Sequence, residues 1–146
     1  MIVDPGGSGD ADTLMDAVLL ADSGDSILIK PGNYLATTVD KSLTISGSPG
    51  VVVDGALVVT APGCRISDIE IAKGSEESDA AVRLDSSDNQ LLRCTVSAIA
   101  TAVVVTGENN TIADSRIDSP QGIEIFGPEN KVLGSEILGG TAIRIN

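Results

Sequence analysis

The sequence predicts an all-β fold, a parallel β-helix (β-solenoid) of coils of about 20 residues with a short capping α-helix near its start. Apolar triplets begin at Val82, Val103, Ile123 and Ile143, in steps of 21, 20 and 20 residues. Self-similarity at such a short period is typical of stacked coils, because each repeat needs its neighbour to bury its apolar face. The segments between the triplets are too short for crossover helices, which excludes a βαβ sheet.

The 146 residues suffice for one domain, 1–146, in three parts. We expect the capping helix over 12–21, because Asp12 or Thr13 can cap it and positions 14, 15, 18 and 19 form an apolar stripe. Residues 26–79 should form irregular first coils, and residues 80–146 the regular ones. The sequence stops partway through a coil, so we expect a fragment truncated at its C-terminal end.

Short alternating segments predict the strands of the first coils. They are bounded by Gly, Pro, Asp or Ser and lie at residues 27–29, 43–45, 51–53, 57–59, 66 and 69–71. Residues 1–11 carry Gly and Asp at the density of a loop. Aromatic residues make up only 1% of the chain, so Val, Ile, Leu and Ala must fill a narrow core with about three short faces per coil.

The charge of the chain excludes several partners. The formal net charge is −12 and the isoelectric point is near 4.1, so we expect neither nucleic acid nor an anionic membrane surface as a partner. The sequence contains no run of 18 apolar residues, so we expect no membrane insertion. Its first residues do not resemble a signal peptide.

Two cysteines, Cys64 and Cys94, are predicted to be free thiols. The repeat alignment pairs Ile66 with Leu91, which places the two cysteines five residues apart around the coil. An extended segment of that length spans about 16 Å, too far for a disulfide. Cys94 is expected to be buried as a small apolar residue.

The chain resembles a known family over essentially its whole length, and segments of its N-terminal part carry the resemblance. The segments VDPGGSGDADTLMDAVLLADSGDSILIKPGNY, VDKSLTISG and VVVDG are similar to the opening of right-handed parallel β-helix proteins of the pectin-lyase-like superfamily, in particular its NosD-like group with carbohydrate-binding (CASH) repeats. The resemblance implies a right-handed solenoid, an extracellular or cell-surface location and a polysaccharide partner. It does not imply one activity, because this superfamily holds lyases, hydrolases, esterases and members without known activity.

Aligning the coils places charged residues in columns on the outer surface. One column holds Asp68, Arg93 and Asp114, and another holds Arg116 beside Glu136. As a catalytic site, the first column would supply carboxylates as acid and base and an arginine for developing charge. As a structural feature, alternating charges would pair across exposed strands.

A third column reads Arg83, Val104, Glu124 and Arg144, in which Arg83 and Glu124 are candidate binding residues together with Arg116 and Glu136 of the second column. We favour charge pairing over catalysis. The chain has no histidine and almost no aromatic residue to stack on sugar rings, and its sequence shows no convergent group of carboxylates.

The sequence contains two further groups of polar residues, an acidic loop and a column of asparagines. Glu76, Glu77 and Asp79 form an acidic loop that is a weak candidate for calcium, although a solvated loop is the simpler interpretation, and we expect no cofactor. Asn89, Asn110 and Asn130 keep the coil spacing, which predicts a structural asparagine ladder with left-handed backbone and stacked amides.

Three functions follow as hypotheses. The first is a non-catalytic scaffold or adhesion segment of a larger extracellular or cell-surface protein. The second is the N-terminal part of a carbohydrate-active enzyme, a polysaccharide lyase or hydrolase. The third is an end-to-end assembly module that self-associates through the open edge of the last coil.

Overall fold

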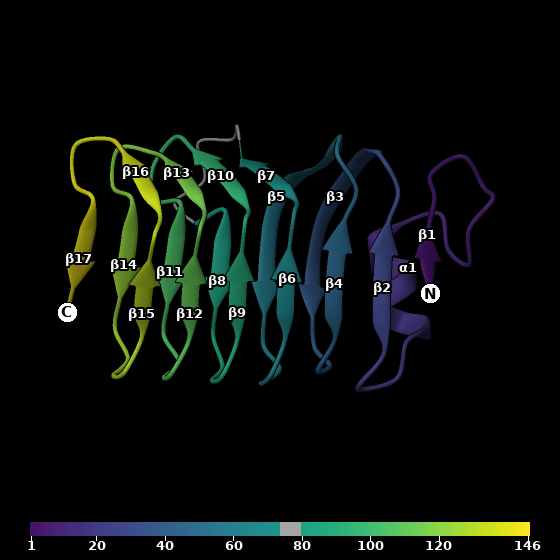
Figure 1. The fold of residues 1–146 in the computed structure, drawn as a ribbon, viewed down its shortest axis with the longest axis horizontal. Coiled ribbons are helices and arrows are strands. Elements are labelled where there is room, and N and C mark those ends of the chain that lie inside the picture. The colour runs from purple at the N-terminus through teal and green to yellow at the C-terminus, as the bar shows by residue number, and fades with distance from the viewer. Residues whose placement is uncertain (74–79) are drawn as a thin grey trace.

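Stacked coils of short parallel strands build the whole molecule. The computed structural model describes residues 1–73 and 80–146 and shows a β-solenoid of about six turns (Figure 1). The paired strands of the described chain run parallel, and an inward apolar residue alternates with an outward one along them. The interior is therefore a column of aliphatic side chains, which are buried from Val3 to Ile125.

The elements and their bounds are β1 Ile2–Val3, α1 Leu14–Leu20, β2 Ser26–Ile29, β3 Gly32–Val39, β4 Thr44–Gly47, β5 Val51–Val59, β6 Arg65–Ser67, β7 Glu70–Lys73, β8 Val82–Leu84, β9 Gln90–Leu92, β10 Thr95–Ala98, β11 Val103–Val105, β12 Thr111–Ala113, β13 Arg116–Asp118, β14 Ile123–Ile125, β15 Lys131–Leu133, β16 Glu136–Leu138 and β17 Ile143–Ile145.

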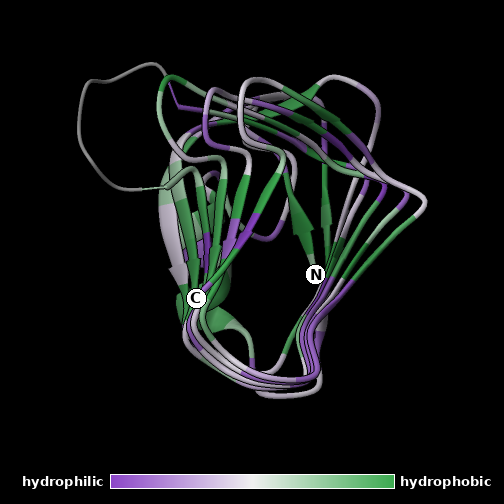
Figure 2. Cartoon of the chain, turned by 90° about the vertical axis from the view of Figure 1, so that its left-hand side faces the viewer, coloured by the Kyte–Doolittle hydropathy of each residue, from purple (hydrophilic) through white to green (hydrophobic). Residues whose placement is uncertain are grey.

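The strands form two sheets that give each coil three faces, as a view along the solenoid shows (Figure 2). A seven-stranded sheet has the order β1-β2-β4-β6-β9-β12-β15. A ten-stranded sheet runs β16-β13-β10-β7-β5-β8-β11-β14-β17, with β3 beside β5. The long strand β5 bends at Gly55 (φ 122°) and pairs with β7 before the bend and with β8 after it, so it joins two faces.

The register confirms the predicted coil length. Val103 pairs with Val82 on one side and with Ile123 on the other, and Ile123 pairs with Ile143. Ile112 lies in the same way between Leu91 and Val132 on the seven-stranded sheet. Residues about 20 apart therefore lie directly over each other.

Two turns flank the seven-stranded sheet, and both contain a residue with left-handed backbone. Six non-glycine residues of the described chain have a positive φ, and all of them lie in these two turns: Asp68, Asp88, Arg93, Asn109, Asp114 and Glu129. An L-residue in this conformation costs about 1–2 kcal/mol. The same turn position takes this conformation in successive coils, and four of the six residues there are Asp or Asn, which tolerate it best.

The asparagine column differs from the prediction in two ways. The left-handed residue is the one before each asparagine, not the asparagine itself. The amide oxygens also bond to the backbone rather than to one another: Asn110 Oδ1 accepts the N–H of Asn89 at 2.9 Å, and Asn130 Oδ1 accepts that of Asn110 at 2.8 Å. Each asparagine thus binds the coil before it through a buried main-chain amide.

A second ladder of the same kind was not predicted. Ser115 Oγ accepts the N–H of Cys94 at 3.2 Å, and Ser135 Oγ accepts that of Ser115 at 3.1 Å. These residues follow the left-handed residues of the other turn. Serine is common in turns for many reasons, so the sequence alone did not single them out.

Helix α1 covers the first coil with a different face from the one expected. Thr13 caps it by accepting the N–H of Asp16 at 3.1 Å. The buried residues are Leu14, Ala17 and Val18, whereas Met15 and Leu19 of the predicted stripe are exposed. Because α1 is apolar almost all round, its sequence pattern did not determine which face would meet the core.

The first coils hold two strands that the sequence did not indicate. Residues 2–3, expected in a loop, form β1 because Ile2 and Val3 pair with Leu28 and Ile29 of β2. Strand β3 begins at Gly32, where a turn was expected, because it pairs with β5. At the other end of the solenoid, Ile145 on β17 is exposed, and self-association through this edge stays a prediction.

Both cysteines are free and Cys94 is buried, as predicted, and Cys64 is buried as well. The register places Thr95 beside Glu70, and hence Cys94 over Ile69, while the N–H of Cys64 donates to Asn89 Oδ1 at 2.8 Å. Loss of hydration raises the pKa of the Cys94 thiol to about 11 and raises that of Cys64.

The asparagine column is expected to contribute measurably to stability. Asn110→Ala leaves the buried N–H of Asn89 without an acceptor, which should lower the free energy of unfolding by about 1–3 kcal/mol. The control Asn33→Ala, at an exposed position of β3, should change it by less than about 0.5 kcal/mol. Denaturant melts measure both, and equal effects would show that the hydrogen bond is not the cause.

The thiols should be unreactive while the chain is folded. At about pH 8 a thiol reagent should modify Cys64 and Cys94 only at the rate of unfolding, because burial keeps both thiols protonated and inaccessible. In concentrated guanidinium both should react at once. Rapid reaction of either cysteine without denaturant would contradict the packing described here.

Candidate functional site

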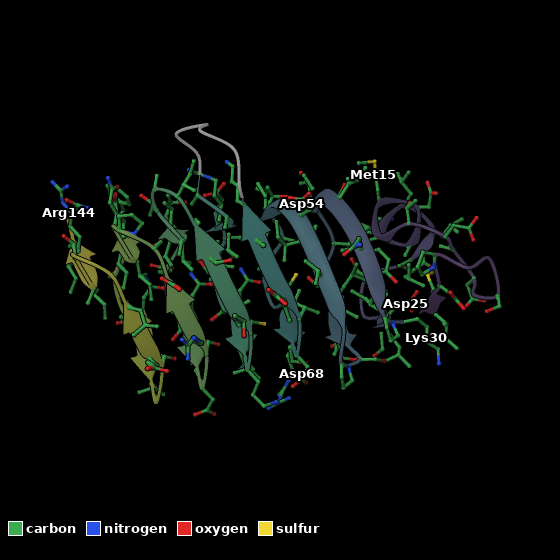
Figure 3. All side chains as sticks on the ribbon, turned by 90° about the horizontal axis from the view of Figure 1, so that it is seen from above. Met15, Asp25, Lys30, Asp54, Asp68 and Arg144 are labelled. Atoms are coloured by element: carbon green, nitrogen blue, oxygen red, sulfur yellow. The ribbon has the colours of Figure 1, made fainter. Side chains whose placement is uncertain are left out.

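The charged residues of the first two predicted columns lie on one side of the solenoid, here called the charged face. It consists of the outward side chains of β7, β10, β13 and β16 and of the turn residues Asp68, Arg93 and Asp114. Figure 3 shows Asp54 and Asp68 at opposite sides of this face. Two arginines, Arg93 and Arg116, lie among the carboxylates of its columns, so the face carries both signs of charge.

Asp68, Arg93 and Asp114 do not lie on strands, as a cross-strand column would require. All three occupy the left-handed position of the turn between the seven-stranded sheet and the charged face, with φ values of 60°, 49° and 52°. The turn directs their side chains to the edge of the face. The sequence predicted their stacking but not their place in the turn, because a period of about 20 residues does not distinguish a strand from its flanking turn.

Asp68 and Arg93 form a two-pronged ion pair. Arg93 Nε lies 2.9 Å from Asp68 Oδ1, and Arg93 Nη2 lies 2.9 Å from Asp68 Oδ2. The hydrogen bond from Arg93 is the main cause that lowers the pKa of Asp68, and the bond in return raises the pKa of Arg93. Asp114 forms no ion pair in the described part of the chain, although its charge also favours the charged form of Arg93.

A second column runs along the strands beside these turns. Glu70, Thr95, Arg116 and Glu136 are in register on β7, β10, β13 and β16. Arg116 Nη1 lies 3.3 Å from Glu136 Oε2, and both side chains are exposed. Exposed pairs of this kind contribute little to stability, at most about 1 kcal/mol.

Two hollows lie on the charged face. One, of about 380 Å³, is bordered by the 47–51 turn, the Asp68–Arg93 pair, Glu70 and Thr95. The other, of about 320 Å³, lies across Ala72 and Ser97 and reaches Asp118. The side chains of Ala72 and Ser97 that line the second hollow are small, so β7 and β10 carry an indented surface with polar groups at both ends.

The register confirms the third predicted column, but Arg83 and Glu124 are not neighbours in it. Val104 lies between Arg83 and Glu124 in the register, which separates their strands by about 10 Å. Arg83 instead binds Asp85 at the end of its own strand, with Nε–Oδ2 and Nη2–Oδ1 distances of 3.2 and 3.1 Å. Thr106 Oγ1 donates to the same carboxylate at 2.9 Å.

Nothing in the described residues assembles a metal centre. Residues 1–73 and 80–146 contain no group of three or more His, Cys, Asp or Glu side chains that could hold an ion. The calcium candidates Glu76, Glu77 and Asp79 lie outside the described residues.

The Asp68–Arg93 pair is not arranged for general acid catalysis. A general acid needs a carboxyl group that keeps its proton near neutral pH, whereas Arg93 engages both oxygens of Asp68 and lowers its pKa. Aromatic stacking is also missing: Tyr34 is buried with its hydroxyl donating to Lys30 O, and Phe126 follows β14 on another face. Hydrogen-bonding groups of the charged face are exposed and already oriented.

Two solved structures are similar to this one. A pectin methylesterase from Aspergillus niger, in a penultimately deglycosylated form, matches with a TM-score of 0.73 and 18% identity over 98% of this chain and 59% of that chain. A pectin methylesterase mutant in complex with a hexasaccharide matches with a TM-score of 0.68 and 15% identity over 90% and 65%. The chain has the right-handed parallel β-helix, pectin-lyase-like fold.

The likeness is one of fold. No protein-family model matches the chain, and no curated protein matches it by sequence. The chain spans 59% and 65% of the lengths of the two pectin methylesterases. No helix among the described residues is long and apolar enough to span a membrane.

The ion pair makes a direct prediction. Arg93→Met should raise the pKa of Asp68 toward its ordinary value of 3.8, because the main lowering cause is the bond from Arg93. In the wild type the ion pair stabilises the fold at pH values above 3.8, the ordinary pKa of Asp68. This contribution is lost as the pH falls through the lowered pKa of Asp68 in the folded protein. Carboxyl NMR titration of wild type and variant measures the shift. Arg83→Met, on another face, should leave the pKa of Asp68 unchanged.

Proposed function

We propose that this chain is a non-catalytic β-solenoid module, of an extracellular or cell-surface protein, that binds polysaccharide on its charged face. The observation that carries the proposal is the Asp68–Arg93 pair beside the hollow over Glu70 and Thr95. Its geometry orients hydrogen-bonding groups toward solvent, and Arg93 holds the Asp68 carboxyl in its charged form.

The fold and charge narrow the expected ligand. The structurally similar proteins are pectin methylesterases, one of them bound to a hexasaccharide, which supports a carbohydrate ligand for this solenoid. A net charge of −12 repels polyanions, so an uncharged polysaccharide is favoured over an acidic one. The extracellular location is supported by the resemblance of the N-terminal segments and by the N-acetylglucosamine stub carried by the Aspergillus protein.

A carbohydrate-active enzyme is the second candidate, favoured by the same structural likeness. Ester hydrolysis would need a carboxylate free to attack or to take a proton. Asp68 is held by Arg93, while Asp114 and Glu70 have no ion-pair partner in the described part of the chain. If the chain were an enzyme, these two carboxylates would be the groups to test.

Binding and catalysis can be separated in one set of experiments. We expect wild-type protein to bind highly methyl-esterified pectin or neutral glycans in titration calorimetry, more tightly than polygalacturonate, and to release no methanol from pectin. Arg93→Gln should weaken binding at least about tenfold, the effect of losing one charge-assisted hydrogen bond.

Arg83→Gln, on a different face, is the matched control and should bind as the wild type does. Tighter binding to polygalacturonate would refute the charge argument. Methanol release that disappears in Asp114→Asn or Glu70→Gln would establish the enzyme instead.

A further inference from the structure

A second surface, at the N-terminal end of the solenoid, has no part in the proposed polysaccharide binding. Here it is called the cap surface and consists of Met15, Leu19 and Leu20 of α1 and Leu35 of β3. Met15 is 54% exposed, Leu19 70% and Leu35 77%. Asp16 is the one polar residue of α1, so this helix presents apolar side chains both to the core and to solvent. A helix that is apolar all round is normally covered on both sides.

A groove lies within the cap surface, between the start of α1 and β3. It has a volume of about 410 Å³, and its apolar walls include Pro5, Met15, Leu35 and Ala36. Concave apolar sites with a few polar groups are the usual form of a recognition site.

An irregularity in β3 creates one wall of this groove. The pairing of β3 with β5 shifts register between Leu35 and Thr37, so that both Leu35 and Ala36 point outward in succession. Gly55 makes room for this bulge: a Cβ on Gly55 would lie 2.9 Å from Ala36 Cβ. Bulges of this kind re-aim side chains and are common beside functional sites. Here the bulge directs a leucine into solvent beside Met15.

Carboxylates border the cap surface. A second cleft, of about 370 Å³, lies against α1 and is lined by Asp10, Asp12 and Asp16 together with Leu19 and Leu20. Asp12 also borders the groove beside Met15. Neither cleft has a lysine or arginine among its lining residues. Asp10, Asp12 and Asp16 therefore form a negative rim along this side of the apolar side chains, while Lys41 lies at the C-terminal end of α1, where its ammonium group is bonded to three carbonyl oxygens.

We propose that the cap surface binds an amphipathic helix of a partner protein, one whose apolar stripe is bordered by lysine or arginine. Met15 and Leu19 are four residues apart and form a ridge that can pack against a second helix, with Leu35 beside it. The negative rim selects a basic partner, because complementary charge steers association and disfavours like-charged partners. A second copy of this chain, with its own charge of −12, is disfavoured for the same reason.

The proposal can be tested with defined peptides. The probe is a fluorescent amphipathic peptide of about 18 residues, long enough to form a helix, with a leucine stripe bordered by lysine. A matched peptide carries glutamate in place of each lysine. Fluorescence anisotropy should show saturable binding of the lysine peptide, weakened by added salt, and at least about tenfold weaker binding of the glutamate peptide.

Variants at exposed positions identify the surface. Met15→Ser combined with Leu35→Ser should weaken binding of the lysine peptide at least about tenfold, because hydrophobic contact provides most of the affinity. Asp12→Asn combined with Asp16→Asn should reduce the salt dependence of lysine-peptide binding, because both carboxylates belong to the negative rim. Phe126→Ser, an exposed apolar residue on another face, is the control and should bind as the wild type does. Thermal melts establish that each variant is folded.

Three results would overturn the proposal. Equal binding of the lysine and glutamate peptides would remove the charge argument, and absence of binding by the lysine peptide would remove the surface as a helix site. Sedimentation that shows a dimer of the wild type, lost in the Met15→Ser and Leu35→Ser variant, would assign the cap surface to a second copy of the chain. None of these results depends on whether the charged face binds polysaccharide.

Discussion

The register between successive coils is the constraint on which the rest of the structure depends. Each strand has only a few residues, so it is stable only when the next coil lies directly over it at about 4.8 Å. Side-chain oxygens in the two turns beside the seven-stranded sheet support this alignment by accepting buried main-chain N–H groups. Asn110 does so in one turn and Ser115 in the other. The free-energy cost of the left-handed residues in these turns is offset by strand pairing between coils on all three faces.

The same turns determine where the charged groups lie. Asp68 and Arg93 stack because they occupy equivalent positions in successive coils, and they point to the edge of the charged face because the left-handed conformation turns the chain there. Their ion pair is therefore a product of the solenoid's own geometry. A binding surface of this type needs no separate scaffold, since every coil adds another row of oriented side chains.

At the N-terminal end of the solenoid a helix packs against the first coil in the place that another coil would take (Figure 1). Helix α1 covers the exposed core there, and Lys41 Nζ donates to the carbonyl oxygens of Val18, Leu19 and Ala21 at the end of the helix. These bonds attach the helix to the segment before β4. The outward side of α1 belongs to the cap surface, which is apolar and therefore differs from the charged face.

The sequence by itself determined the solenoid, the coil length, the strand register from Val82 onward and the separation of the two thiols, because a repeat of about 20 residues can bury its aliphatic side chains only by stacking. It also indicated that Asp68 would lie beside Arg93. Only the tertiary structure decided which turn residue takes the left-handed position, which face of α1 meets the core and where Arg83 finds its partner. Those choices depend on contacts that the coil period does not encode, such as the pair that Arg83 forms with Asp85 at the end of its own strand.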